Sequence, residues 1–152
     1  MLAGALIFIV PPPVATQFHE TKAVQYKSVT VTPDITIALD ANTAITVSNS
    51  EPPKVELIRG NAYFDSKSLT LDTRILEIIV GDIRFWDMGA NFSLQKLKQG
   101  SSIAVTQGQV EMNLGSQTRQ IGAGQRIDFD NERIIEESLI VELDIAPWRL
   151  AH

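Results

Sequence analysis

Side chains that commonly catalyse reactions or bind metals are few and scattered in this sequence. The chain has two histidines, His19 and His152, and no cysteine. One histidine lies close to the amino terminus and the other is the last residue, so a metal site or a histidine base needs partners that only the fold can supply. The lack of cysteine excludes disulfides, thiolate zinc sites and thiol catalysis. We therefore expect both histidines to be ordinary solvated side chains, and we expect no metal site.

Carboxylates are more numerous, and paired carboxylates can hydrolyse glycosidic bonds. Most of the aspartates stand beside turn residues, where the side chain accepts hydrogen bonds from its own backbone. These aspartates are Asp34, Asp40, Asp65, Asp72, Asp82, Asp87, Asp128 and Asp130. Their spacing matches no calcium-binding loop, no serine lies in a nucleophile elbow, and no glycine-rich loop precedes a helix as phosphate binding requires. The sequence therefore predicts a protein that is not an enzyme, with no catalytic residue and no cofactor.

The length of the chain indicates how many domains it forms, and its charge bears on nucleic-acid binding. With 152 residues, the chain is predicted to form one main domain whose core needs no cross-links. The formal net charge is -5, and no basic run exceeds Lys96-Leu97-Lys98, so we expect no nucleic-acid-binding surface.

Apolar and polar residues alternate with a period of two through most of the chain, which is typical of short β-strands. Two sequence motifs, residues 59–65 and 107–113, share one pattern: each follows a strand-like run and has a glycine followed by alternating polar and apolar residues. Their glycines are Gly60 and Gly108, and a looser copy includes Gly124. A glycine at such a point allows a backbone conformation that other residues avoid. With a further turn at Asp34, the pattern predicts an all-β fold of short strands, either a twisted solenoid-like stack or a jelly-roll-like sandwich.

Two tryptophans and two apolar segments need separate interpretation. Leu76–Val80 is predicted to be a buried strand, and residues 132–145 are predicted to be a turn followed by a strand. Trp86 is predicted to be a core side chain, with contact to a partner as the alternative. Trp148 and Arg149, near the end of the chain, are the other candidates for partner contact.

The amino end is almost purely apolar from Met1 to Val10 and continues into Pro11-Pro12-Pro13. Such a short apolar run cannot span a bilayer as a helix, which takes about 20 residues. Three interpretations stay open: the exit end of a membrane helix, which we favour, a weak signal sequence, or a segment packed on the body. The predicted organisation is an apolar leader and Pro-rich spacer over residues 1–20, an all-β domain over 21–145, and the start of a following module over 146–152.

From Thr21 to Trp148, the sequence motifs of this chain resemble those of the periplasmic part of FecR-type sigma-factor regulators. The best match is Val55-Glu56-Leu57-Ile58-Arg59-Gly60-Asn61-Ala62-Tyr63-Phe64-Asp65, which is similar to the family's valine and leucine leading into a glycine-started aromatic strand. Residues 103–112 are similar to the family's closing hairpin, and residues 146–149 to the alanine-tryptophan that leads into its terminal module.

The chain departs from the family pattern at three places. Val24 stands where the family usually has glycine. Ile35 replaces the glycine of an Asp-Gly turn, so that turn must adopt another type. The run Gly81-Asp82-Ile83-Arg84-Phe85 is one residue longer than the corresponding glycine-threonine phrase.

The resemblance implies a signalling protein of the periplasm, anchored in the inner membrane by an amino-terminal helix. In such regulators a cytoplasmic segment binds an extracytoplasmic-function sigma factor. The periplasmic part receives a signal from the amino-terminal domain of a TonB-dependent outer-membrane receptor loaded with iron-siderophore. The implied partners are therefore that receptor domain, the sigma factor and the inner membrane.

A second hypothesis is a periplasmic β-jellyroll carrier of lipid or lipopolysaccharide, because such proteins are also built from short strands around an apolar trough. The direction of Leu76–Val80 and Phe85 separates the two hypotheses. A sealed core favours the relay, and an open apolar groove favours the carrier.

Overall fold

A computed structural model of the chain describes residues 15–68, 70 and 73–140. They form thirteen strands and no helix. The strands are β1 (Thr16–Glu20), β2 (Lys27–Thr32), β3 (Ile35–Leu39), β4 (Ala44–Ser48), β5 (Lys54–Ser66), β6 (Leu76–Val80), β7 (Ile83–Asp87), β8 (Asn91–Leu97), β9 (Gly100–Gln107), β10 (Gln109–Leu114), β11 (Gln117–Gly122), β12 (Gln125–Phe129) and β13 (Ile134–Leu139). The prediction of an all-β fold of short strands is confirmed.

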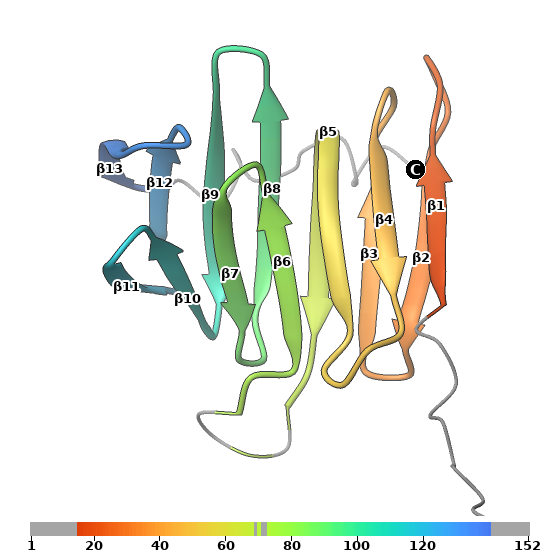
Figure 1. Ribbon diagram of the computed structural model, residues 1–152, viewed down its shortest axis with the longest axis horizontal. Coiled ribbons are helices and arrows are strands. Elements are labelled where there is room, and N and C mark those ends of the chain that lie inside the picture. The colour runs from red at the N-terminus through yellow and green to blue at the C-terminus, as the bar shows by residue number, and fades with distance from the viewer. Residues whose placement is uncertain (1–14, 69, 71–72, 141–152) are drawn as a thin grey trace, which may run out of the picture.

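The strands form two layers that share β5, as Figure 1 shows. Sheet A has the strand order β1-β4-β5-β6-β7-β10-β11. Sheet B has the order β2-β3-β5-β8-β9-β12-β13. The pair β5–β6 is parallel, and the other pairs are antiparallel. Successive hairpins are added alternately to one sheet and then to the other, so the fold is a short curled stack. The repeated glycine motifs of the sequence indicate such a stack.

Residues with positive φ, most of them glycines, lie where the chain passes from one sheet to the other. Residues 54–59 of β5 pair with β4 in sheet A, and residues 60–65 pair with β8 in sheet B, so Gly60 lies at a crossing inside one strand. Positive φ angles, in degrees, occur at six crossings: Val24 (54), Asn42 (55), Gly60 (92), Gly89 (90), Gly108 (77) and Gly124 (90). The glycine of the repeated motif therefore marks a point where the chain crosses between sheets.

The core fills the space between the two sheets. Inward-facing residues alternate with outward-facing ones along β3, β6 and β7, as the period of two requires. Phe85 of sheet A contacts Phe129 of sheet B with ring centroids 5.3 Å apart and a tilt of 59°. Phe64 and Phe92 stack within sheet B at 4.7 Å. The Phe85–Phe129 contact joins the two layers, and all four rings are buried in the core.

Polar pairs link the two sheets at both ends of the stack. At the amino end, the Lys27 Nζ of β2 donates a hydrogen bond of 3.0 Å to the His19 Nδ1 of β1. At the other end, Arg119 of β11 forms an ion pair with Glu137 of β13. Each pair joins the outermost strand of one sheet to the outermost strand of the other, among the residues that the structure describes.

Several details differ from the sequence-based expectations. Thr16–Glu20, which we assigned to the spacer, forms β1 and pairs with β4. Leu76–Val80 is a strand, but Glu77 and Ile79 are half-buried on its outer side, because sheet A has one face turned away from the core. Beside the turn at Asp34, β2 carries a bulge that the sequence pattern did not indicate, where its register with β3 shifts between Thr30 and Thr32.

The apolar leader, Trp148 and Arg149 lie outside the described residues. Within the described part of the chain, no helix has the length and hydropathy needed to cross a membrane.

Candidate protein-binding face

The outer face of sheet A carries a row of side chains centred on Trp86. Strand pairing places Trp86 of β7 opposite Glu77 of β6 on one side and Glu111 of β10 on the other. The row continues to Lys54 of β5 and to Gln120 of β11. Directly opposed residues lie about 5 Å apart and can interact. Five strands thus bring one aromatic, one cationic, two acidic and one amide side chain together.

Arg74 lies over the indole ring and links it to Glu111. Its guanidinium carbon is 5.0 Å from the centroid of the Trp86 ring, a cation–π contact. Its Nη2 donates a hydrogen bond of 2.8 Å to the Oε2 of Glu111. The Nε2 of Gln120 donates to the other oxygen, Oε1, at 3.3 Å. The carboxylate of Glu111 therefore has a partner on each oxygen.

On the other side of Trp86, Glu77 is held between two cations. Its Oε1 lies 3.8 Å from the Lys54 Nζ and 3.7 Å from the Arg84 Nε. The side chain of Glu77 is 18% exposed, whereas those of Lys54 and Arg84 are 48% and 53% exposed. The carboxylates lie close to the sheet, and the cations extend towards solvent.

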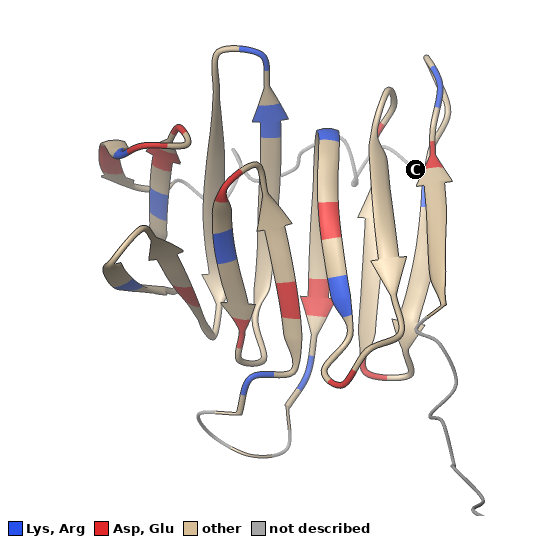
Figure 2. Ribbon diagram, viewed as in Figure 1, with Lys and Arg blue, Asp and Glu red and all other residues tan. Residues whose placement is uncertain are grey.

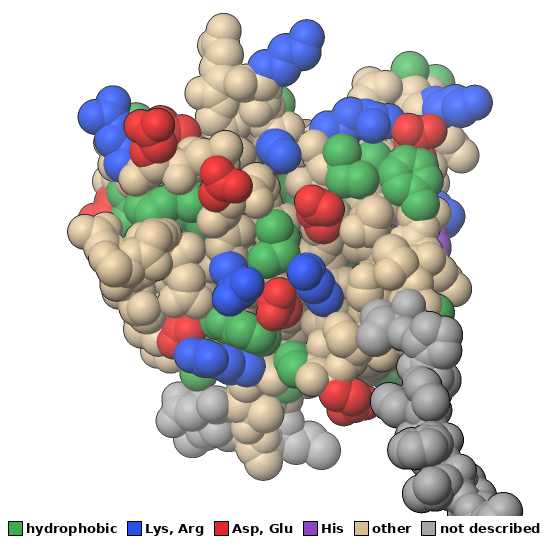
Figure 3. Space-filling model, in the orientation of Figure 1, with side chains coloured by type: hydrophobic (Ala, Val, Ile, Leu, Met, Phe, Trp, Pro, Cys, Tyr) green, Lys and Arg blue, Asp and Glu red, His purple; other side chains and the backbone are tan. Residues whose placement is uncertain are grey.

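We call these residues the Trp86 cluster: Lys54, Arg74, Glu77, Arg84, Trp86, Glu111 and Gln120. Figure 3 shows this face as a mixture of basic, acidic and apolar side chains, and Figure 2 shows the charges carried by its strands. Each carboxylate of the cluster is paired with a cation, so the arrangement favours binding over acid–base chemistry. Tryptophan and arginine are among the side chains that most often supply the binding energy at protein interfaces.

The core assignment of Trp86 is wrong. The residue is half-buried on the outer face because its neighbour Phe85 points into the core and alternate residues of a strand face opposite ways. The alternative interpretation, contact with a partner, is the one compatible with this position. Sequence reasoning missed Arg74, Glu77 and Glu111. Alternation could place the two glutamates on an outer face, but their proximity depends on the pairing of β10 with β7.

The predicted turn residues lie where the chain changes direction. Gly60, Gly108 and Gly124 are at sheet crossings, and Asp34 is in the turn between β2 and β3. They lie outside the Trp86 cluster and determine the path of the strands.

Asp87, at the end of β7, is a fully buried carboxyl group. Burial raises its pKa to about 6, opposed by hydrogen bonds from the Ser66 side chain and from the Gly89 and Ala90 backbone. The Gly89 amide donates to Oδ1 at 2.9 Å, whereas Oδ2 has no hydrogen-bond partner among the described residues. Perturbed carboxyl groups are frequent at functional sites, but this one lies inside the body at the crossing to β8.

His19 also departs from the solvated side chain that we expected. Its ring is half-buried in β1, and burial together with the adjacent Lys27 lowers its pKa. Among the described residues, no group of three or more histidine, aspartate or glutamate side chains is arranged to hold a metal ion.

The comparisons with known proteins agree with this architecture. The sequence signature of the FecR protein family matches residues 17–111, from β1 into β10, which is more than half of the chain. The chain belongs to the FecR family. Among curated proteins, no sequence matches it closely.

Solved structures share the fold. Two crystal structures of a candidate anti-sigma factor from Parabacteroides distasonis, at 2.50 and 1.65 Å resolution, superpose with TM-scores of 0.74 and 0.72, each at 17% sequence identity. The alignments cover 89% and 88% of this chain, but 65% and 64% of theirs. The chain thus spans slightly less than two thirds of the length of these solved structures.

Proposed function

We propose that this FecR domain is the extracytoplasmic relay of a sigma-factor regulator. It passes a signal from the amino-terminal domain of a TonB-dependent outer-membrane receptor to an extracytoplasmic-function sigma factor in the cytoplasm. Membership of the FecR family is the observation that carries this proposal. The fold shared with a candidate anti-sigma factor is compatible with it.

In this proposal, residues 1–20 include the anchor in the inner membrane, and the all-β body lies in the periplasm. Residues 146–152 lead into a further module, and Trp148 with Arg149 contacts a partner there. The domain works by protein contact, without catalysis, and the Trp86 cluster is its main contact surface on the body. A half-buried tryptophan on the outer face, between arginines and paired carboxylates, supports that assignment.

The state of the core favours a relay over a lipid carrier. A carrier needs an open apolar trough, and Leu76, Ile78, Val80 and Phe85 are the side chains that would line it. All four are between 0% and 1% exposed and pack between the sheets. Space for an acyl chain would require the two sheets to separate.

Copurification of the full-length parent regulator tests the proposal. Tagged regulator is incubated separately with the cognate sigma factor and with the isolated receptor domain, and bound protein is quantified. We expect the cytoplasmic segment to retain the sigma factor and the periplasmic part to retain the receptor domain. If neither protein is retained, the proposed relay is wrong.

A further inference from the structure

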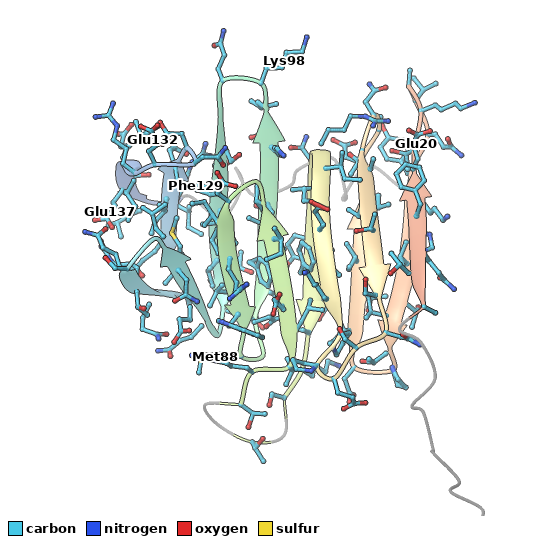
Figure 4. All side chains as sticks on the ribbon, in the orientation of Figure 1. Glu20, Met88, Lys98, Phe129, Glu132 and Glu137 are labelled. Atoms are coloured by element: carbon cyan, nitrogen blue, oxygen red, sulfur yellow. The ribbon has the colours of Figure 1, made fainter. Side chains whose placement is uncertain are left out.

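A shallow basin lies beside Gly60, where β5 crosses from sheet A to sheet B. Three segments line it: residues 40–42, residues 58–61 and residues 96–98. Its volume is about 580 Å³. Gly60 pairs with Lys96 in the register of β5 and β8, so the β8–β9 hairpin continues beyond the crossing and forms one wall. Figure 4 shows Lys98 at the tip of this hairpin.

Two large apolar side chains face solvent in this basin. Leu97 is 58% exposed and Ile58 is 36% exposed. They come from different segments, 96–98 and 58–61, that the fold brings to the same hollow. Apolar side chains grouped in a hollow with a polar rim are typical of a contact surface.

The charges around the basin are mainly positive. Lys96 and Lys98 form no ion pair with any described residue, and Arg59 pairs with Glu20 outside the lining. The one acidic lining residue, Asp40, is already engaged: its Oδ1 accepts from the Ala41 amide at 2.8 Å, and its Oδ2 accepts from the Asn61 side chain at 3.4 Å. The basin is therefore locally cationic in a chain whose net charge is -5.

We propose that the basin binds an extended acidic segment of a protein partner. An apolar side chain of that segment inserts between Ile58 and Leu97, and flanking carboxylates pair with Lys96 and Lys98. Charge complementarity selects an anionic partner, and the hollow shape selects a protruding segment over a flat membrane surface. The basin shares no residue with the Trp86 cluster, and the proposal does not depend on the relay or on its partners.

Nuclear magnetic resonance titration of the ¹⁵N-labelled 152-residue chain tests the proposal. The probe is the blocked peptide Glu-Glu-Leu-Glu-Glu, and the matched peptide has glutamine at each glutamate position. We expect saturable amide shifts at residues 40–42, 58–61 and 96–98 with the acidic peptide at low salt, and weak shifts with the glutamine peptide. The double variant Lys96→Glu/Lys98→Glu should lower the affinity at least about tenfold.

The control variant is Lys67→Glu, which changes an exposed lysine after the other end of β5. It should bind the acidic peptide as the parent chain does. The proposal is overturned if millimolar acidic peptide gives no saturable shifts, or if Lys67→Glu weakens binding as much as the double variant. It is also overturned if vesicles of phosphatidylcholine and phosphatidylglycerol shift the basin amides and the acidic peptide does not.

Discussion

Burial of Asp87 makes the stability of the body depend on pH. Its pKa in the folded chain is about 6, above the ordinary value of 3.8, so the folded state retains a proton that the unfolded state releases between these values. Stability therefore falls as pH rises from about 4 to about 6, then levels off. The shift corresponds to roughly 3 kcal/mol, as an order of magnitude.

Asp87→Asn should remove this loss of folding stability at higher pH. The amide oxygen can still accept from the Gly89 amide, and no charge is buried. We expect the variant to be more stable than the parent at pH 7.5, by about 1–3 kcal/mol, and to vary less between pH 4.5 and 6.5. Urea unfolding at several pH values measures both effects. Equal pH profiles for the parent and the variant would contradict the prediction.

Val24 is a β-branched residue in a conformation that favours glycine. Its φ is +54°, and its side chain is 91% exposed, so no packing offsets the strain. Val24→Gly should relieve backbone strain of about 1–3 kcal/mol. The greater conformational freedom of glycine in the unfolded chain cancels part of this gain in stability. We predict a net gain of about 1 kcal/mol, measured by denaturant unfolding.

Asn42 provides the matched control for that substitution. Its φ is +55°, but asparagine tolerates this conformation, so Asn42→Gly should change stability little. A gain in Asn42→Gly as large as that in Val24→Gly would show that the effect does not arise from β-branching.

At the scale of the strands, the sheet crossings depend on glycine for two separable reasons. Gly60 and Gly124 have nearly the same φ, +92° and +90°. A Cβ atom at Gly60 would lie 2.7 Å from the Thr43 Cα and 2.8 Å from the Asn42 carbonyl oxygen, whereas a Cβ at Gly124 meets nothing within 4 Å. Backbone strain therefore applies to both positions, and collision to Gly60 alone.

Alanine substitutions separate these effects. Gly124→Ala should cost about 1–2 kcal/mol from backbone strain, and Gly60→Ala at least about 1 kcal/mol more. Gly108→Ala should resemble Gly60→Ala, because its Cβ would lie 2.9 Å from the Ala90 Cα. Thermal and urea unfolding of the three variants measure the difference. Equal losses at Gly60 and Gly124 would exclude a role for collision.

Much of the strand pattern could be predicted from local sequence. Alternation in Leu76–Val80 and glycines such as Gly60 are local signals, so the strands and the crossings between them leave a trace in the chain. The environment of Trp86 leaves no such trace. It depends on β10 pairing with β7 and on Arg74 approaching from the connection before β6, and these are contacts between distant segments.

At the scale of the molecule, two curled sheets with a sealed core form a platform whose outer surfaces are available to other proteins. The Trp86 cluster on sheet A is the surface to which we assign signal reception. A tryptophan that anchors an interface contributes about 2 kcal/mol or more, roughly 30-fold in affinity. Its removal should interrupt signalling without unfolding the body, because the ring lies outside the core.

Transcription from a promoter dependent on the sigma factor tests the relay directly. Cells carry the full-length parent regulator, its Trp86→Ala variant, or the control Ile135→Ala, which truncates an apolar side chain of β13 that is 54% exposed. At equal protein levels, we predict that Trp86→Ala loses most of the response to the inducing signal and that Ile135→Ala retains it. A full response in the Trp86→Ala cells would contradict reception of the signal by this face.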